Sequence, residues 1–236
     1  MAPAPLAVPT AVLTAAEPLT ASGFAPFGAV AANPRPDLHP SSALRAALPP
    51  GAVPANQGSA LRYARPAGEL RDAYAGAPSG AAGAPVVSVF ACAARSLRRA
   101  PSGLLFDVGL LERHPFTSQT FVPLSADGAA TRYLVVVAPD LPAPARGGHV
   151  PHSPLPDITA LRAFVATGRQ AVTYAAGTWH APMVALGAPG AVVDFVVVQF
   201  ANGVAAEDCE EVALTGPGGV VVSVAPEVLG TPLARL

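Results

Sequence analysis

The chain has 236 residues, of which 51% are hydrophobic and 12% are charged, with 14 basic side chains against 15 acidic ones. This composition excludes a disordered chain. The absence of a basic stripe argues against a nucleic-acid or anionic-membrane partner and for a small molecule. All the basic residues are arginines, which also excludes Schiff-base chemistry, a pyridoxal anchor and a phosphate-loop lysine.

The first third of the chain is predicted to be mostly loop. Residues 1–16 are apolar but interrupted by prolines, so we predict a poorly ordered segment there, followed by a single domain over residues 17–236. The Pro-rich run from Asn33 to Gly58 is predicted as a loop, and the stretch from Ala75 to Pro85 as a flexible connection. No segment offers about 18 uninterrupted apolar residues, so no membrane partner is expected.

After Pro85, short β-branched or aromatic runs alternate with turn residues, which is typical of an antiparallel β domain. One helix is expected to interrupt them, with Asp157 as its N-cap, apolar residues at helical spacing and Gly168 as its stop. Many short strands with one helix favour a closed or sandwich-like barrel. Strands are predicted at residues 86–92, 103–111, 118–123, 132–138, 171–175, 183–186, 194–200 and 218–226.

A polar cluster stands inside the apolar stretch "LLERHPFTSQTFVPL". In an extended strand Glu112 and His114 point to one side and Arg113 to the other, and Gln119 can join the first two after a turn. Much later, "AAGTWH" adds His180. These side chains can ligate a divalent metal or perform acid–base work. The alternative without function is that Glu112 and Arg113 form a surface ion pair and that His114, before Pro115, caps the end of a strand.

The two segments resemble the two motifs of the cupin superfamily. "E-R-H-x4-Q" is similar to H-x-H-x(3,4)-E, with glutamate for the first histidine and glutamine for the glutamate, and "A-A-G-T-W-H" is similar to P-x-G-x-x-H, with Ala175 for the proline. The resemblance implies a mainly β fold. We therefore expect a cupin-like antiparallel β-barrel of the jelly-roll type with a few short helices, in which the two segments furnish one pocket.

Most of the chain resembles the ureidoglycolate lyases, also called ureidoglycolate hydrolases, of allantoin degradation. The resemblance extends from Leu19 to Glu211, and the cysteine-bearing and "FANG" segments look most like the fungal members. Departures are the alanine-rich loops and the "GHVPHS" insertion. The motifs that carry it, in order, are "EPLTASGFAPFGAV", "NQGSALRY", "SVFACAARSL", "LERHPFTSQTFVPL", "RYLVVVAP", "PDITALRAFVATGRQAVTYAAGTWHAPMVAL" and "DFVVVQFANGVAAEDCEEV".

This resemblance implies a homodimeric enzyme that splits (S)-ureidoglycolate into glyoxylate and urea, which releases purine nitrogen for use. The substrate is a carbinolamine, so the reaction needs a base for the hydroxyl proton, an acid for the departing nitrogen and a cation or donor cluster for the carboxylate. We expect His180 or His114 to take the hydroxyl proton and Glu112 to carry a proton to urea.

Substrate contacts are expected mainly from the "NQGSALRY" segment, and Arg113 is a weaker candidate because strand alternation turns it away from His114. Alternation also turns Trp179 away from His180, so packing is its expected role and a lid is the alternative. Histidines 39, 149 and 152 lie in Pro-rich loops and are expected to face solvent. The candidate substrate contacts are Asn56, Arg62, Tyr63, Gln119 and Trp179.

A divalent metal is a possible cofactor, and Ni²⁺, Mn²⁺ or Zn²⁺ would suit such a site. The missing first histidine weakens the site relative to metal-dependent cupins, and the reaction can proceed without a metal because carbinolamines decompose spontaneously. The candidate ligands are Glu112, His114, Gln119 and His180.

Two other functions stay open at this point. The same residues could serve another metal-dependent cupin enzyme, such as an oxygenase or isomerase, or a barrel that binds a carboxylate metabolite without turning it over. Cys92 and Cys209 are far apart in sequence, so no disulfide is expected and a cytoplasmic location is favoured. The last three residues, "ARL", are similar to a peroxisomal address, which is the alternative.

Overall fold

The computed structural model describes residues 3–40, 48–63, 68–101, 103–125, 127–142 and 154–229. The predictions made for His149, His152 and the C-terminal "ARL" lie outside these residues. Within them, no helix is both long enough and apolar enough to cross a membrane.

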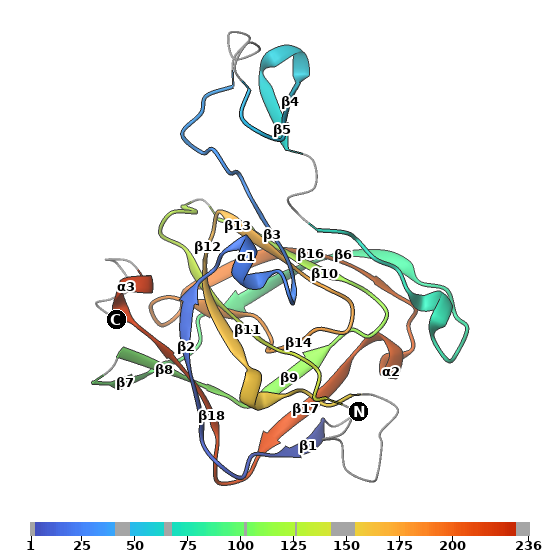
Figure 1. The fold of residues 1–236 in the computed structure, drawn as a ribbon, viewed down its shortest axis with the longest axis vertical. Helices are drawn as coiled ribbons and strands as arrows, with labels where there is room; N and C mark the ends of the chain where they lie inside the picture. The colour runs from blue at the N-terminus through green and yellow to red at the C-terminus, as the bar shows by residue number, and fades with distance from the viewer. Residues whose placement is uncertain are drawn as a thin grey trace.

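The chain is mainly β with a few short helices, which confirms the predicted fold class (Figure 1). The largest sheet is bounded by β1 and β7, so within the described residues its hydrogen-bonded order does not close on itself. Its strands run in the order β1 (Ala4–Ala7), β17 (Glu210–Thr215), β9 (Leu110–Arg113), β14 (Trp179–His180), β11 (Arg132–Ala138), β12 (Arg162–Thr167), β2 (Val12–Pro18), β18 (Val220–Val224), β8 (Gly103–Val108) and β7 (Arg98–Ala100), with β15 (Val184–Leu186) paired to β11.

A second, antiparallel sheet packs against this one, and a two-stranded hairpin stands apart from both (Figure 1). The second sheet has the order β3 (Gly28–Ala32), β13 (Gln170–Tyr174), β10 (Gln119–Leu124), β16 (Val192–Ala201) and β6 (Ala84–Ala93). The hairpin pairs β4 (Ala52–Ala55) with β5 (Ala60–Tyr63). The helices are α1 (Ala21–Phe24), α2 (Ala205–Asp208) and α3 (Pro226–Leu229), with 3₁₀ turns η2 (Asn56–Gly58), η3 (Tyr74–Gly76) and η5 (Ile158–Ala160).

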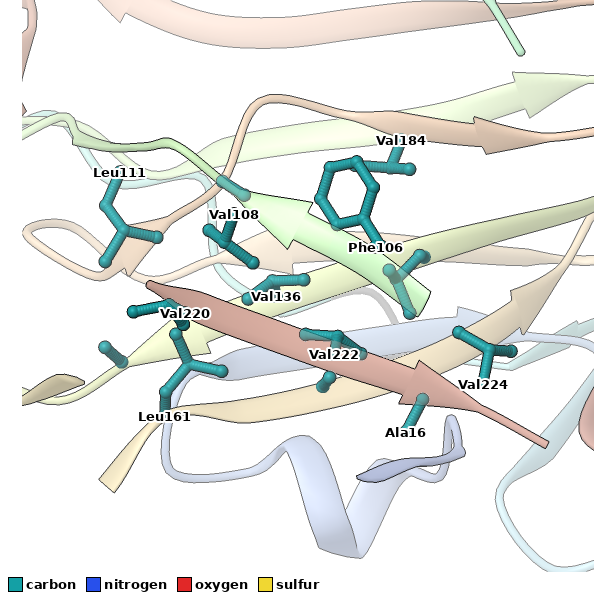
Figure 2. Packing of buried hydrophobic residues seen from close by; sticks show 14 of the residues in the cluster. Ala16, Phe106, Val108, Leu111, Val136, Leu161, Val184, Val220, Val222 and Val224 are labelled. Atoms are coloured by element: carbon teal, nitrogen blue, oxygen red, sulfur yellow. The ribbon is translucent and has the colours of Figure 1, made fainter. Parts of the chain in front are cut away.

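Strand β11 separates two hydrophobic cores because both of its faces are buried. Leu134 and Val136 belong to a cluster enclosed by the curved first sheet, which Figure 2 shows around β18 and β8. Tyr133 and Val135 belong to a second cluster, between the first sheet and the five-stranded sheet. Burial of an apolar side chain contributes about 1.5–3 kcal/mol, so both layers stabilise the fold. The candidate site lies in the second layer.

The prediction of a helix after Asp157 is wrong for most of the segment. Asp157 does cap a helix, accepting hydrogen bonds from Thr159 N and Ala160 N, but that helix is only the 3₁₀ turn η5. The chain continues as β12, and the four central residues of this strand, 163–166, are all buried. A strand buried on both faces gives a continuous apolar run, and such a run cannot be told from a helix by periodicity alone.

Residues 3–16 include strand β1 and most of β2, whereas the sequence predicted loop there. Strand β1 pairs in parallel with β17, and β2 lies in parallel between β18 and β12. The prolines are compatible with these strands because Pro5 lies on an edge strand and Pro18 ends β2, positions where a missing N–H is tolerated. Residues far apart in sequence supply the partners, which no local pattern could show.

Two further loop predictions need correction. The run from Asn33 to Gly58 contains strand β4 and turn η2, because the exposed hairpin tolerates Pro54 as an edge strand does. The stretch from Ala75 to Pro85 is attached to the body, since the backbone N and Oγ of Ser79 each donate a 2.7 Å hydrogen bond to the Glu207 carboxylate.

Candidate active site

Glu112 and His180 lie on adjacent strands in direct register, β9 and β14, and face the layer between the two large sheets. His180 Nε2 is 3.5 Å from Glu112 Oε1. His114, just after β9, has its ring centroid 5.5 Å from that of His180. On the far side, Tyr174 of β13 stacks on His180 at 4.0 Å. The structure therefore brings together the three residues for which sequence analysis predicted proton transfer.

Backbone carbonyl groups hold both imidazoles in one tautomer. His114 Nδ1 donates to the carbonyl oxygen of Asp208 at 2.6 Å, and His180 Nδ1 donates to that of Thr178 at 2.8 Å. A carbonyl oxygen can only accept, so each Nδ1 must carry a proton. In the neutral rings each Nε2 is then a lone-pair acceptor, ready to bind a proton or a metal.

The site has more acceptors than donors. His114 Nε2 and His180 Nε2 are buried and have no hydrogen-bond partner among the described residues. The 3.5 Å contact of His180 with Glu112 is too long for a good hydrogen bond and, with both groups in their acceptor forms, places two acceptors face to face. Buried acceptors without a partner are costly, so a proton, a substrate donor or a cation belongs between them.

The protonation states follow from burial and charge. For the His114 imidazole, burial and then the charge of His180 lower the pKa below its usual value. For Glu112, burial raises the pKa, but the neighbouring His180 and His114 imidazoles outweigh it, so the pKa is lowered. At neutral pH the site therefore contains an ionised carboxylate and a neutral His114.

Gln119 faces the same layer from β10, where it is paired with Tyr174 of β13. Its Nε2 donates to Gln199 Oε1 at 2.7 Å, which fixes the orientation of the amide. Its Oε1 is buried without a partner among the described residues and is a further free acceptor. Gln119 thus presents an amide oxygen without a partner among the described residues to the layer in which the cluster lies.

Strand alternation correctly predicted the residues that face away. Arg113 lies with its guanidinium 4.7 Å from the Trp179 ring on the opposite side of the sheet and pairs with Glu210 at 2.7 Å. Trp179 is 2% exposed and belongs to the first hydrophobic core. Its indole donates to Pro154 O at 3.2 Å. Within this chain Trp179 therefore packs rather than lining the site.

The structure separates the "NQGSALRY" residues from the cluster. Asn56 begins η2 at the tip of the hairpin, and Arg62 and Tyr63 lie on β5, which Figure 1 shows standing clear of β9 and β14. His39 is exposed, as predicted. The three hairpin residues are not assembled with Glu112 by their own chain.

Sequence analysis missed the second ring of residues around the cluster. Tyr174 and Asp208 position the two imidazoles, and Cys209 and Glu211 lie with their ligand atoms within 4.8 Å of Glu112. Burial and nearby carboxylates raise the pKa of Cys209 to about 12, so its thiol stays protonated. The signal was present in "EDCEEV", which contains three of these four residues, but nothing in that segment says that β17 pairs with β9.

A histidine pair and a carboxylate thus meet between two sheets of a mainly β, cupin-like fold, and residues of these types are suited to proton transfer or to metal binding. The family model for ureidoglycolate lyase matches residues 11–221. The ureidoglycolate lyase of Schizosaccharomyces pombe is 32% identical over 209 residues, covering 89% of this chain and 95% of that protein. This chain belongs to the ureidoglycolate lyase family.

Further relatives agree with that assignment. The ureidoglycolate lyase of Burkholderia mallei is 36% identical over 182 residues, covering 77% of this chain and 79% of that protein. That of Saccharomyces cerevisiae is 46% identical over 80 residues, covering 34% and 35%. The two yeast proteins are in line with the fungal resemblance of the sequence motifs.

Proposed function

We propose that the protein cleaves (S)-ureidoglycolate to glyoxylate and urea, with Glu112, His114 and His180 as its proton-transfer groups. Beyond family membership, one observation supports this function: two buried imidazole nitrogens without a partner among the described residues lie close to a half-buried carboxylate. The reaction moves one proton from the hydroxyl oxygen to the departing nitrogen while the C–N bond breaks. A site with surplus acceptors suits that task.

The protonation states set the order of events. A neutral imidazole with a free Nε2 can take the hydroxyl proton, and His180 has Glu112 next to it to accept that proton in turn. Because Glu112 is ionised at neutral pH, it must receive this proton before it can protonate the urea nitrogen. Glu112 is therefore a shuttle between the hydroxyl and the leaving group rather than an acid protonated from the start.

The same residues fit a divalent metal. Glu112, His114 and His180 each offer a ligand atom, and these atoms lie within 4.8 Å of one another. Both imidazoles have Nδ1 bound to a backbone carbonyl, which is the usual outer-shell arrangement of metal-binding histidines. Gln119 Oε1 is the candidate fourth ligand atom. As the alternative to proton transfer by the free imidazoles, we propose that these residues hold Ni²⁺, Mn²⁺ or Zn²⁺, which when bound would acidify the substrate hydroxyl in place of an imidazole base.

The test is to incubate the protein with (S)-ureidoglycolate before and after chelation and to measure glyoxylate, urea and ammonia. Release of glyoxylate with urea in equal amounts is expected. Glyoxylate with ammonia and carbon dioxide would show hydrolysis of the ureido group instead, and no turnover with tight binding would show a binding protein. Oxygen consumption in the presence of Fe²⁺ would point to an oxygenase.

We also propose a cytoplasmic location. A fluorescent fusion that leaves the C-terminal "ARL" free tests this proposal, because punctate fluorescence that overlaps a peroxisomal marker would contradict it.

A further inference from the structure

The β4–β5 hairpin meets the body at its root, where Tyr63 lines a groove with residues of β3, β10 and β13, and its strands extend beyond this contact. It forms a two-stranded sheet of its own, and no described strand of the body pairs with it. Figure 1 shows it standing clear of the two large sheets. A hairpin of two short strands is at best marginally stable in water without a surface to pack on. We therefore expect the hairpin to pack on a surface outside its own chain.

The hairpin carries a cation without an acid to pair with. Arg62 is exposed on β5, and no carboxylate of the described residues forms an ion pair with it. Asn56 is exposed at the tip, where the backbone turns through a left-handed φ of 47°. The hairpin thus presents a guanidinium and an amide, groups that suit a carboxylate and a ureido group.

The candidate active site lacks the positive charge that the hairpin carries. Within the described residues, the Glu112 carboxylate has its ion-pair contact with His180, and no arginine forms an ion pair with it. Arg113 is committed to Trp179 and Glu210 on the other side of the sheet. A substrate with a carboxylate needs a cation beside the Glu112 carboxylate of this cluster. The cluster and the hairpin therefore complement each other in charge, although they lie far apart within a single chain.

The outer face of the five-stranded sheet, next to the root of the hairpin, exposes apolar side chains that a second protein chain could cover. Cross-strand pairs put Val89 of β6, Val196 of β16 and Val122 of β10 on one face, opposite to the buried Phe121 and Val197. On this outer face Val87 is 70% exposed, Val89 65% and Leu124 56%. An exposed apolar face of this kind marks a protein–protein interface.

The root of the hairpin lies next to that outer face. A groove of about 420 Å³ is lined by Tyr63 together with Val122 and residues of β3 and β13. The Tyr63 hydroxyl is buried there without a hydrogen-bond partner among the described residues. In a two-fold dimer the same face and the same hairpin occur on both copies, so each copy can cover what the other exposes.

The family resemblance implies a homodimer. We propose that its two copies pack through the outer face of the five-stranded sheet, and that the hairpin of each brings Arg62 and Asn56 to the Glu112–His114–His180 cluster of the other. The substrate carboxylate would then lie between the Arg62 guanidinium of one copy and the imidazoles of the other. This inference rests on the proposed lyase function, because that function supplies the carboxylate. The site would be incomplete in a single chain.

The test is complementation between two defective chains that carry different affinity tags. His180→Ala removes the base and Arg62→Ala removes the cation, and each homodimer should lose about 10²-fold or more in kcat/KM. In the purified mixed dimer, the intact hairpin of the first chain meets the intact cluster of the second, so about half the wild-type activity should return. If hairpin and cluster act within one chain, no site is intact and activity stays low.

Arg71 is the matched control, since it is the alternative cation within one chain. Its backbone N donates to Ser118 Oγ at 2.8 Å, and it lines a groove of about 290 Å³ beside Ala175 and Ala176. We expect Arg71→Ala to keep wild-type kcat/KM. Failure of the mixed dimer to recover activity overturns the exchange of hairpins, as does wild-type activity in Arg62→Ala.

A second measurement does not depend on turnover. Sedimentation of the wild-type protein should show a dimer, and Val89→Asp on the outer face should shift it to a monomer that keeps its circular dichroism spectrum. A monomeric wild type overturns the inference whatever the activity. A dimeric wild type that releases no glyoxylate would contradict the lyase function alone.

Discussion

His114 and His180 face each other with ring centroids 5.5 Å apart, and the Nδ1 of each donates a hydrogen bond to a backbone carbonyl oxygen. Their carbonyl partners belong to Asp208 and Thr178, so the backbone itself selects the tautomer. Both free Nε2 atoms are buried. This arrangement determines what the site can do, because a ring in the other tautomer would present a donor where the hydroxyl proton has to be accepted.

Replacement of His180 by alanine should lower the rate of glyoxylate release by about 10²–10⁴-fold, the usual contribution of a general base. The cavity left beside Tyr174 should not unfold the protein, which circular dichroism and a thermal melt can verify. The matched control is His39→Ala, because His39 is exposed and should be neutral. Normal turnover by the His180 variant would show that the base lies elsewhere.

Tyr74 and Tyr133 provide a matched pair for testing the support of His114. The Tyr74 hydroxyl donates to the Asp208 carboxylate at 2.6 Å, whereas the Tyr133 hydroxyl donates to Gln170 O at 2.6 Å, away from the site. Tyr74→Phe should lower stability by about 1.5–3 kcal/mol, and Tyr133→Phe by about 1 kcal/mol.

Only the first change should affect catalysis, since Asp208 presents the carbonyl that orients His114. We expect kcat of Tyr74→Phe to fall by about 10-fold, with a smaller change in KM, as is usual when an outer-shell partner is lost. Equal kcat values for the two variants, measured on fully folded protein, would rule out this positioning role.

Acid should destabilise the chelated protein. The pKa of His114 is lowered in the folded state, so the stabilising effect of the neutral ring is complete above the unfolded value of about 6.5 and is lost as pH falls toward the folded value. Glu112 acts in the same direction at lower pH, because its folded pKa is also lowered. Urea unfolding between pH 7.5 and 5 measures this slope.

His114→Asn is the control for that measurement, because it removes the titrating ring and should flatten the slope near pH 6. The acid limb of kcat/KM should likewise have its midpoint below about 6.5. Stability that increases on acidification from pH 7 to 5.5 would contradict the assignment of a neutral His114.

Chelation tests the metal proposal independently of the fold. Glyoxylate release should fall on dialysis against a chelator and return with Ni²⁺, Mn²⁺ or Zn²⁺, and elemental analysis should find about one metal ion per chain. Glu112→Gln should bind the metal at least about 10-fold more weakly. Full activity in a protein that contains almost no metal would favour acid–base catalysis by the side chains alone.

Strand alternation accounts for the parts of the site that the sequence predicts well. Side chains in a strand alternate between two faces, so Glu112 and His114 had to separate from Arg113, and His180 from Trp179. The structure agrees with each of these placements. Apolar runs bounded by turn residues likewise predicted β6, β10, β11 and β16 within two residues at each end.

Long-range pairing accounts for what the sequence did not reveal. The expected helix became β12 because both faces of that segment are buried, one in each core. Strands β1 and β2 form because β17, β18 and β12 supply their hydrogen-bond partners. In each case the decisive contacts come from segments far away in the chain, and they override local propensity.

The amino-acid sequence by itself determined a β-rich chain, the face that each polar side chain takes within its strand, and a set of groups suited to proton transfer or metal binding. The tertiary structure alone decided that β14 lies beside β9, that Asp208 and Thr178 supply the carbonyls that select the tautomers, and that the Arg62 hairpin stands clear of its own cluster. The physical reason is that alternation follows from local backbone geometry with a period of two residues. The choice of neighbouring strand depends instead on burial and hydrogen bonding summed over the whole chain.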